Sequence, residues 1–144
     1  MSKGENKGEI GDYTRAIQID PNDAEAYLNR GNAKADLGDY QGAIEDFSRA
    51  IQIDPNDAAA YLNRGNAKSA LGDYQGAIED YSRAIQINPN DAQAYVLRGI
   101  AKSVLGNKQG GLSDLQKGAE LCKAQGNREF YESVQQIIQD LSLR

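Results

Sequence analysis

Ile53-Asp54-Pro55-Asn56-Asp57 is the most informative segment of this chain, because close copies of it recur at intervals of 34 residues. The copies are Ile19-Asp20-Pro21-Asn22-Asp23 before it and Ile87-Asn88-Pro89-Asn90-Asp91 after it. The segments 24–57 and 58–91 differ at only five positions. A fixed period of this length indicates stacked supersecondary units rather than a closed globule. Such stacks expose long surfaces, and these surfaces usually bind other chains.

Each unit around this stretch is predicted to hold two helices. Asp23 is expected to cap the first helix, because its short carboxylate accepts hydrogen bonds from free amides of the first turn. The first helix spans 24–37 and ends at Gly38, since glycine tolerates the left-handed conformation common just past a helix. A second helix spans 40–53 and stops at Asp54, because the residue before a proline resists the helical region.

The second helix of each unit carries an apolar stripe of helical period, which predicts a buried face. In the first unit this stripe consists of Ala43, Ile44, Phe47, Ala50 and Ile51. The third unit loses regularity in its second half. There, lysines replace a tyrosine and the proline, and glycines replace two alanines, at Lys108, Lys123, Gly111 and Gly118.

The two ends of the chain depart from the repeat. After Gly126-Asn127 a final helix is predicted, with an apolar face that includes Val134 and a polar outer side. Terminal units of a stack need such a polar side. At the start, 11–20 aligns with 45–54, so the chain begins with a second helix that lacks its own first helix. Several glycines make the start of this helix weak.

Composition excludes several classes of function. The net charge of −5 and the pI of about 4.7 argue against nucleic-acid binding, which needs cationic surface. Histidine is absent and Cys122 is the single cysteine, so the commonest general base and zinc ligand are missing. No apolar run is long enough to span a membrane, and no leader segment is visible, so a soluble cytoplasmic protein is the default expectation. No catalytic motif, cofactor site or metal site is predicted.

The 34-residue unit resembles the tetratricopeptide repeat. The skeleton that carries the resemblance is Tyr27, Gly31, Ala43, Phe47, Ala50 and Pro55, then Tyr61, Gly65, Ala77, Tyr81, Ala84 and Pro89. The resemblance implies an all-α solenoid of antiparallel helix pairs, wound as a right-handed superhelix with a C-terminal capping helix. The chain is then a single domain over 1–144. Its parts are a partial unit, three full units of which the third is degenerate, and a cap, over 1–23, 24–57, 58–91, 92–125 and 126–144.

A recurring arginine departs from the family pattern and has a structural explanation. Arginines recur where the family usually has leucine, each with an aspartate at the same spacing: Arg30, Arg64 and Arg98 with Asp46, Asp80 and Asp114. An Arg–Asp ladder within or between units is expected to hold the first helix against the second. An anion-binding stripe that adds Lys34, Lys68 and Lys102 is the alternative.

The resemblance implies that the first helices line a concave groove that binds peptides. The candidate groove residues are Glu25, Leu28, Asn29, Asn32, Asp36, Leu62, Asn63, Asn66, Val96 and Ile100. Their asparagines are similar to the asparagine ladder of the O-linked N-acetylglucosamine transferase repeat domain, which holds a peptide backbone. An amide suits this role because it offers both a donor and an acceptor. The set is broken in the third unit, where Leu97 and Ile100 replace asparagine.

Three hypotheses about function follow. The favoured one is a non-catalytic module that binds a partner peptide or helix, of unknown identity, in this groove. The second is a structural scaffold that self-associates weakly through residues 9–20, or an engineered array without a natural partner. The third, an enzyme or a fragment of one, has no support in these residues. A carboxylate clamp for acidic C-terminal tails fits poorly, because Leu28 stands where that clamp has lysine.

Overall fold

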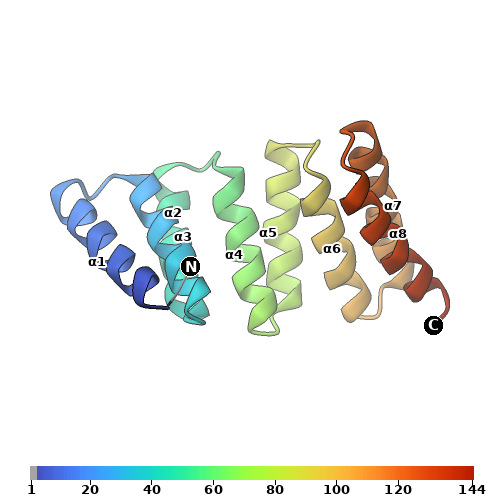
Figure 1. Cartoon of the computed structure of the whole chain (residues 1–144), viewed down its shortest axis with the longest axis horizontal. Helices are drawn as coiled ribbons and strands as arrows, with labels where there is room; N and C mark the ends of the chain where they lie inside the picture. The colour runs from blue at the N-terminus through green and yellow to red at the C-terminus, as the bar shows by residue number, and fades with distance from the viewer. Residues whose placement is uncertain (1–2) are drawn as a thin grey trace. The chain divides into compact units, whose positions relative to one another are not determined.

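The computed structural model describes residues 3–144, which form eight helices in two compact units (Figure 1). Unit 1, residues 1–73, contains α1 (Lys3–Ile19), α2 (Ala24–Asp36), α3 (Tyr40–Ile53) and α4 (Ala58–Ala70). Unit 2, residues 74–144, contains α5 (Tyr74–Ile87), α6 (Ala92–Val104), α7 (Lys108–Ala124) and α8 (Arg128–Ser142). Within each unit, consecutive helices pack side by side in alternating directions. The expected all-α fold of antiparallel helix pairs is confirmed. The first two residues of the expected partial unit lie outside the described residues.

Local chemistry explains where the helices begin and end. The Asp23 carboxylate accepts a hydrogen bond of 3.1 Å from the Ala26 amide, and Asp57 accepts one of 3.3 Å from Ala60. These bonds satisfy backbone donors that the first turn leaves free. Just past α2, Gly38 has a φ of +84°, the left-handed conformation that ends a helix at little cost for glycine. The expected caps and stops are therefore confirmed.

The core of unit 1 is built where the repeat skeleton places large and small side chains together. Tyr27 packs with Ala50 and Ala60, and Phe47 packs with Ala43 and Ala67. A Cβ atom at Gly31 would lie 2.7 Å from the Phe47 ring, so only glycine lets α2 approach α3 this closely. Burying an aromatic ring of this size stabilises the fold by about 2–3 kcal/mol.

The initial helix differs from its expected weak start. α1 is helical from Lys3 onward, and Gly8 and Gly11 both lie inside it. Packing against α2 overrides their low helix propensity. Ile17 packs against the cluster around Tyr27, so its own chain covers part of the segment 9–20 for which self-association was one hypothesis.

The glycines that replace alanines in the third repeat allow its two helices to pack closely. Gly118 and Gly111 lie on α7 where it meets α6, and a Cβ atom at Gly118 would lie 2.6 Å from Cγ2 of Val96. Small residues here let the two helices approach closely. Val96 then enters a core cluster with Leu115, Ala119 and Val134, which α8 covers. α7 is also longer than α3, 17 residues against 14, because Lys123 stands where proline would stop it.

Candidate functional site

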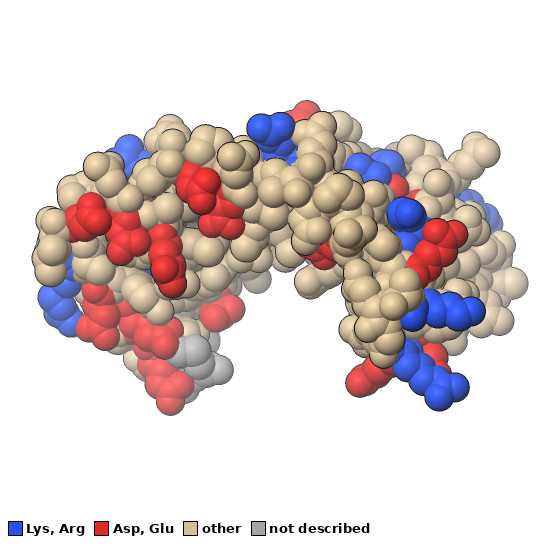
Figure 2. Space-filling view, turned by 90° about the horizontal axis from the view of Figure 1, so that it is seen from above, with Lys and Arg blue, Asp and Glu red and all other residues tan. Residues whose placement is uncertain are grey.

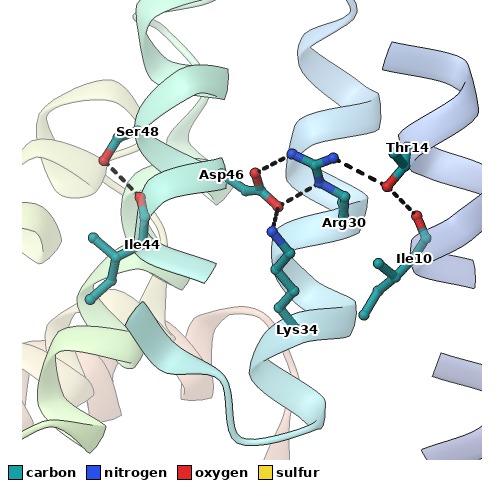
Figure 3. Close-up of polar contacts among 7 residues, drawn as sticks. All are labelled: Ile10, Thr14, Arg30, Lys34, Ile44, Asp46 and Ser48. Atoms are coloured by element: carbon teal, nitrogen blue, oxygen red, sulfur yellow. Dashed lines mark hydrogen bonds and ion pairs between the residues drawn. The ribbon is translucent and has the colours of Figure 1, made fainter. Parts of the chain in front are cut away.

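The recurring arginines hold the first helix of a repeat against the second. In unit 1, Nε and Nη2 of Arg30 donate to the two carboxylate oxygens of Asp46 at 2.8 and 2.7 Å (Figure 3). Nζ of Lys34 lies 3.0 Å from Oδ2 of the same carboxylate. Because the Asp46 side chain is only 4% exposed, its bidentate pair of hydrogen bonds with Arg30 is shielded from solvent. This pair fixes the rotation of α2 relative to α3.

The same arginine also reaches the preceding helix. Nη1 of Arg30 donates to Oγ1 of Thr14 on α1 at 3.2 Å, and that hydroxyl donates to the Ile10 carbonyl (Figure 3). Arg64 repeats the contact with Ser48 at 3.1 Å, and Arg98 repeats it with Ser82 at 3.2 Å. The ladder therefore joins consecutive helix pairs. The sequence had pointed to the aspartates but not to the hydroxyls, which are evident as partners only from the packing.

Contacts within this ladder shift the pKa of Asp114, Arg98 and Arg30. Burial would raise the pKa of Asp114, but hydrogen bonds from Arg98 and Lys102 and their positive charges outweigh it and lower the pKa below 3.8. The hydrogen bond to Asp114 raises the pKa of Arg98 against the opposing effect of burial, and Asp46 acts in the same way on Arg30. The expected Arg–Asp ladder is confirmed for Arg30 and Arg98. These cations serve the fold.

The ladder leaves a different face of α2 open. Glu25, Asn29, Asn32 and Asp36 fall at intervals of four, three and four residues, so they follow one stripe along three turns of the helix. Glu25 and Asp36, at its two ends, are exposed, and the two asparagines between them are half-buried. The stripe therefore presents two amides between two carboxylates.

An amide pair joins this stripe to α4. Nδ2 of Asn63 donates to Oδ1 of Asn32 at 3.0 Å. The bond orients both amides, and it leaves the Nδ2 group of Asn32 and the Oδ1 atom of Asn63 available as a donor and an acceptor. A main-chain peptide group needs this complement. We name the area formed by the α2 stripe with Asn63 and Asn66 the α2–α4 surface.

Two hollows lie on the α2–α4 surface. One, of about 560 Å³, is bordered by the amide pair and by Asp36, Tyr40 and Asn66. The other, of about 710 Å³, lies toward the N-terminal ends of α2 and α4 and is bordered by Glu25, Leu28 and Asn29, together with Asp54 and Asp57. Tyr40 had not been predicted here. The sequence predicts that Tyr40 begins the second helix, but whether Tyr40 reaches the hollow depends on how α3 packs.

The remaining predicted site residues differ in how deeply they are buried. Leu28 and Leu62 are half-buried, and Leu28 packs against the cores around both Tyr27 and Phe47. Val96 is only 4% exposed and lies in the core of unit 2, so the structure does not place it on an open surface. Its burial follows from the close approach of α7 at Gly118.

Ile100 lies on a separate apolar hollow within unit 2. The hollow has a volume of about 310 Å³. Its border includes Val104 on α6 together with Ile137 and Leu141 on α8. Val104 lies two turns from Leu97 on the helix face that was expected to bind, whereas Ile137 and Leu141 had not been predicted as site residues.

Other kinds of site receive no support from the described part of the chain. Residues 3–144 contain no group of three or more cysteine, aspartate or glutamate side chains placed to hold a metal ion. Over the same residues, no helix combines the length and apolar character that crossing a bilayer requires.

Sequence comparison finds similarity to a known repeat family. A model described as "TPR repeat" matches residues 1–38 and 31–72. A second model, described as "Tetratricopeptide repeat", matches residues 58–91. No curated protein sequence matches the chain.

Several solved structures have similar folds, and two of those described next are complexes with a partner. MamA aligns with a TM-score of 0.78 at 24% identity, over 97% of this chain and 90% of that one. The TPR2B domain of yeast Sti1, in a complex with pHsp70, aligns with a TM-score of 0.80 at 24% identity, over 83% and 96%. The second TPR of Spaghetti (RPAP3), bound to the HSP90 peptide SRMEEVD, aligns with a TM-score of 0.67 at 30% identity, over 68% and 91%.

Proposed function

The chain belongs to the tetratricopeptide repeat family, and on that premise we propose that it is a non-catalytic module that binds an extended segment of a partner protein on the α2–α4 surface. The amide pair of Asn32 and Asn63 carries the proposal. Its mutual hydrogen bond orients one donor and one acceptor toward an incoming main chain, which lowers the ordering cost of binding.

The surroundings of the amide pair support this role. Hollows on the surface provide room for side chains of a bound segment, and Leu28 and Tyr40 add apolar contact area. The related Sti1 and RPAP3 domains are described in complexes with pHsp70 and with an HSP90 peptide, respectively. The pHsp70 and HSP90 partners are those of Sti1 and RPAP3, and the partner of this chain depends on its own surface residues.

The number of available hydrogen bonds limits the affinity. Four asparagine hydrogen bonds at about 1 kcal/mol each give about 4 kcal/mol. A micromolar complex requires about 8 kcal/mol. Apolar contacts with Leu28 must supply much of the difference, so we expect micromolar or weaker binding to an isolated peptide.

Selection of displayed random peptides on the purified protein tests the proposal. Peptides that emerge should bind the natural sequence by calorimetry and lose at least tenfold in affinity on the double substitution Asn32→Ala and Asn63→Ala. Asn22→Ala is the matched control, because Asn22 is an exposed loop asparagine that borders neither hollow. Helicity of all variants is checked by circular dichroism. Equal binding by the double variant and the control would refute the assignment of this surface.

Self-association through residues 9–20 has weaker support. Ile17 packs on the Tyr27 cluster within its own chain, whereas Ile19 remains 86% exposed. One exposed isoleucine is a small area for a stable dimer, which buries about 800 Å² per partner. Sedimentation at high concentration distinguishes the two hypotheses, because a concentration-dependent dimer would favour the scaffold.

A further inference from the structure

The negative charge of this protein is concentrated in unit 1. Residues 1–73 contain 13 acidic and 8 basic side chains, whereas residues 74–144 contain 8 of each. The whole net charge of −5 therefore belongs to unit 1. At the left of Figure 2, on the visible face of unit 1, Asp and Glu side chains cover more of the surface than Lys and Arg side chains. A charge imbalance of this kind attracts ligands of the opposite sign.

The lysines and arginines of α2 and α4 do not border the hollows of the α2–α4 surface. Arg30 and Lys34 on α2 are both engaged by the buried Asp46 carboxylate. Arg64 on α4 donates to Ser48 and lies over the Tyr61 ring, 5.6 Å from its centre. Among the side chains that the structure describes, no lysine or arginine borders either hollow of the α2–α4 surface. An anionic segment would therefore meet no counter-charge there.

Unlike these lysines and arginines, acidic side chains do border the hollows of the α2–α4 surface. Glu25 borders one hollow and Asp36 borders the other, and both side chains are exposed. Among the described residues neither carboxylate has an ion-pair partner. Asp57, beside Glu25, is already used to cap α4 through the Ala60 amide. This cap offsets the positive end of the α4 dipole, so the helix terminus does not reverse the sign of the surface.

From this arrangement, which rests on the proposed function of the α2–α4 surface, we propose that the bound segment is a basic peptide. Its main chain contacts the amide pair, and two of its lysine or arginine side chains contact Glu25 and Asp36. The partner chemistry is thus opposite in charge to the acidic peptide SRMEEVD of the RPAP3 complex.

The helix sets the spacing of the two cations. Glu25 and Asp36 are eleven residues apart, which at about 1.5 Å per residue separates them by about 16 Å along α2. An extended peptide advances about 3.3 Å per residue, so about five residues span the distance. Cations on the same face of an extended peptide have an even spacing. Lysines four positions apart, with their flexible side chains, satisfy both conditions.

Three labelled ten-residue peptides test the proposal by fluorescence anisotropy. They share one neutral sequence of serine, alanine and asparagine with a central leucine, which supplies the apolar contact with Leu28. At two positions four residues apart they carry two lysines, two glutamines or two glutamates. We expect the lysine peptide to bind about three- to tenfold more tightly than the glutamine peptide, and the glutamate peptide to bind most weakly. The lysine preference should shrink as salt increases, because exposed ion pairs are screened. A fourth peptide with adjacent lysines should show less than half of the preference.

Two matched pairs of substitutions test whether Glu25 and Asp36 cause the preference for the lysine peptide. The double substitution Glu25→Gln and Asp36→Asn should reduce the affinity for the lysine peptide to that for the glutamine peptide. Glu9→Gln with Glu45→Gln removes the same two charges from α1 and α3 of the same unit, outside both hollows, and should leave most of the preference in place.

The outcomes separate this proposal from the proposed function. A glutamate peptide that binds as tightly as the lysine peptide would overturn it, as would a lysine preference that survives Glu25→Gln and Asp36→Asn. In either case, loss of binding on Asn32→Ala and Asn63→Ala would leave the α2–α4 surface standing as a peptide site. If none of the peptides binds at millimolar concentration, both the basic-peptide proposal and the surface assignment fail.

Discussion

Arg98 and Asp114 face each other across α6 and α7 through two hydrogen bonds of 2.8 Å, from Nε and Nη2 to the two carboxylate oxygens. Arg30 and Asp46 repeat this geometry in unit 1 with bonds of 2.8 and 2.7 Å. In both pairs a lysine one turn further along the helix contacts the same carboxylate. One buried acid thus holds two cations, and its loss leaves both without their counter-charge.

Asp46→Asn should therefore destabilise the protein by about 2–4 kcal/mol, because Arg30 and Lys34 lose the carboxylate that compensates their partial burial. Urea unfolding followed by circular dichroism measures the change. Glu45→Gln is the control, since Glu45 is the exposed neighbour on the same helix, and it should shift stability by less than about 0.5 kcal/mol. Similar effects of the two substitutions would contradict a structural role for the ladder.

Acid should weaken unit 2 through Asp114. Its pKa in the folded chain is lowered below the ordinary 3.8, so the unfolded chain binds the proton more readily. The resulting stabilisation is complete above pH 3.8 and is lost as the pH falls through the lower pKa of the folded state.

Urea unfolding of the natural sequence and of Asp114→Asn, from about pH 7 to pH 2.5, tests this expectation. The difference in unfolding free energy between the two proteins should narrow below about pH 4. A difference that stays constant to the lowest pH would show that the Asp114 carboxylate contributes nothing specific.

Alanine substitution of two helical glycines should have opposite effects. At Gly111 a Cβ atom would lie 2.7 Å from the Gly99 carbonyl oxygen, and backbone cannot easily move away. Gly111→Ala should cost about 1–3 kcal/mol in spite of its better helix propensity. At Gly8 nothing lies within 4 Å of the added atom, so Gly8→Ala should stabilise α1 by up to about 1 kcal/mol. Thermal melts compare the two, and stabilisation by both would refute the close approach of α6 and α7.

The thiol of Cys122 should react slowly in the folded protein. It is 1% exposed, and burial raises its pKa above the ordinary value. Fewer thiolate ions form, and reagents reach them only after local opening. Reaction with a chromogenic disulfide at about pH 8 should be at least tenfold slower in buffer than in concentrated urea. Equal rates would indicate that α7 and α8 separate readily.

The asparagines show how far a sequence can predict a site. Their recurrence on the first helices singled out Asn32 and Asn63 as groove candidates. It did not reveal that these two amides bond each other, because the partners belong to different repeats and different positions within them. The bond requires the offset between α2 and α4, which helix packing sets.

Val96 was also predicted as a groove residue, but it is buried in the fold. By register it matches Leu28, which is half-buried and borders a hollow, yet Val96 is enclosed in the core. The difference arises from Gly118 on another helix, and no property of the α6 sequence reports it.

The helices of this protein could be predicted from the amino-acid sequence alone, because their boundaries depend on local chemistry. Aspartate caps such as Asp23, glycine stops such as Gly38 and the proline that follows Asp54 mark them. The availability of side chains for binding could not be predicted in this way, because it depends on how the helices pack. Burial, the pairing of Asn32 with Asn63 and the capture of Arg30 by Asp46 and Thr14 each depend on the distance and rotation between helices. Those quantities are set by side chains that lie far apart in the sequence and meet only in the packed fold.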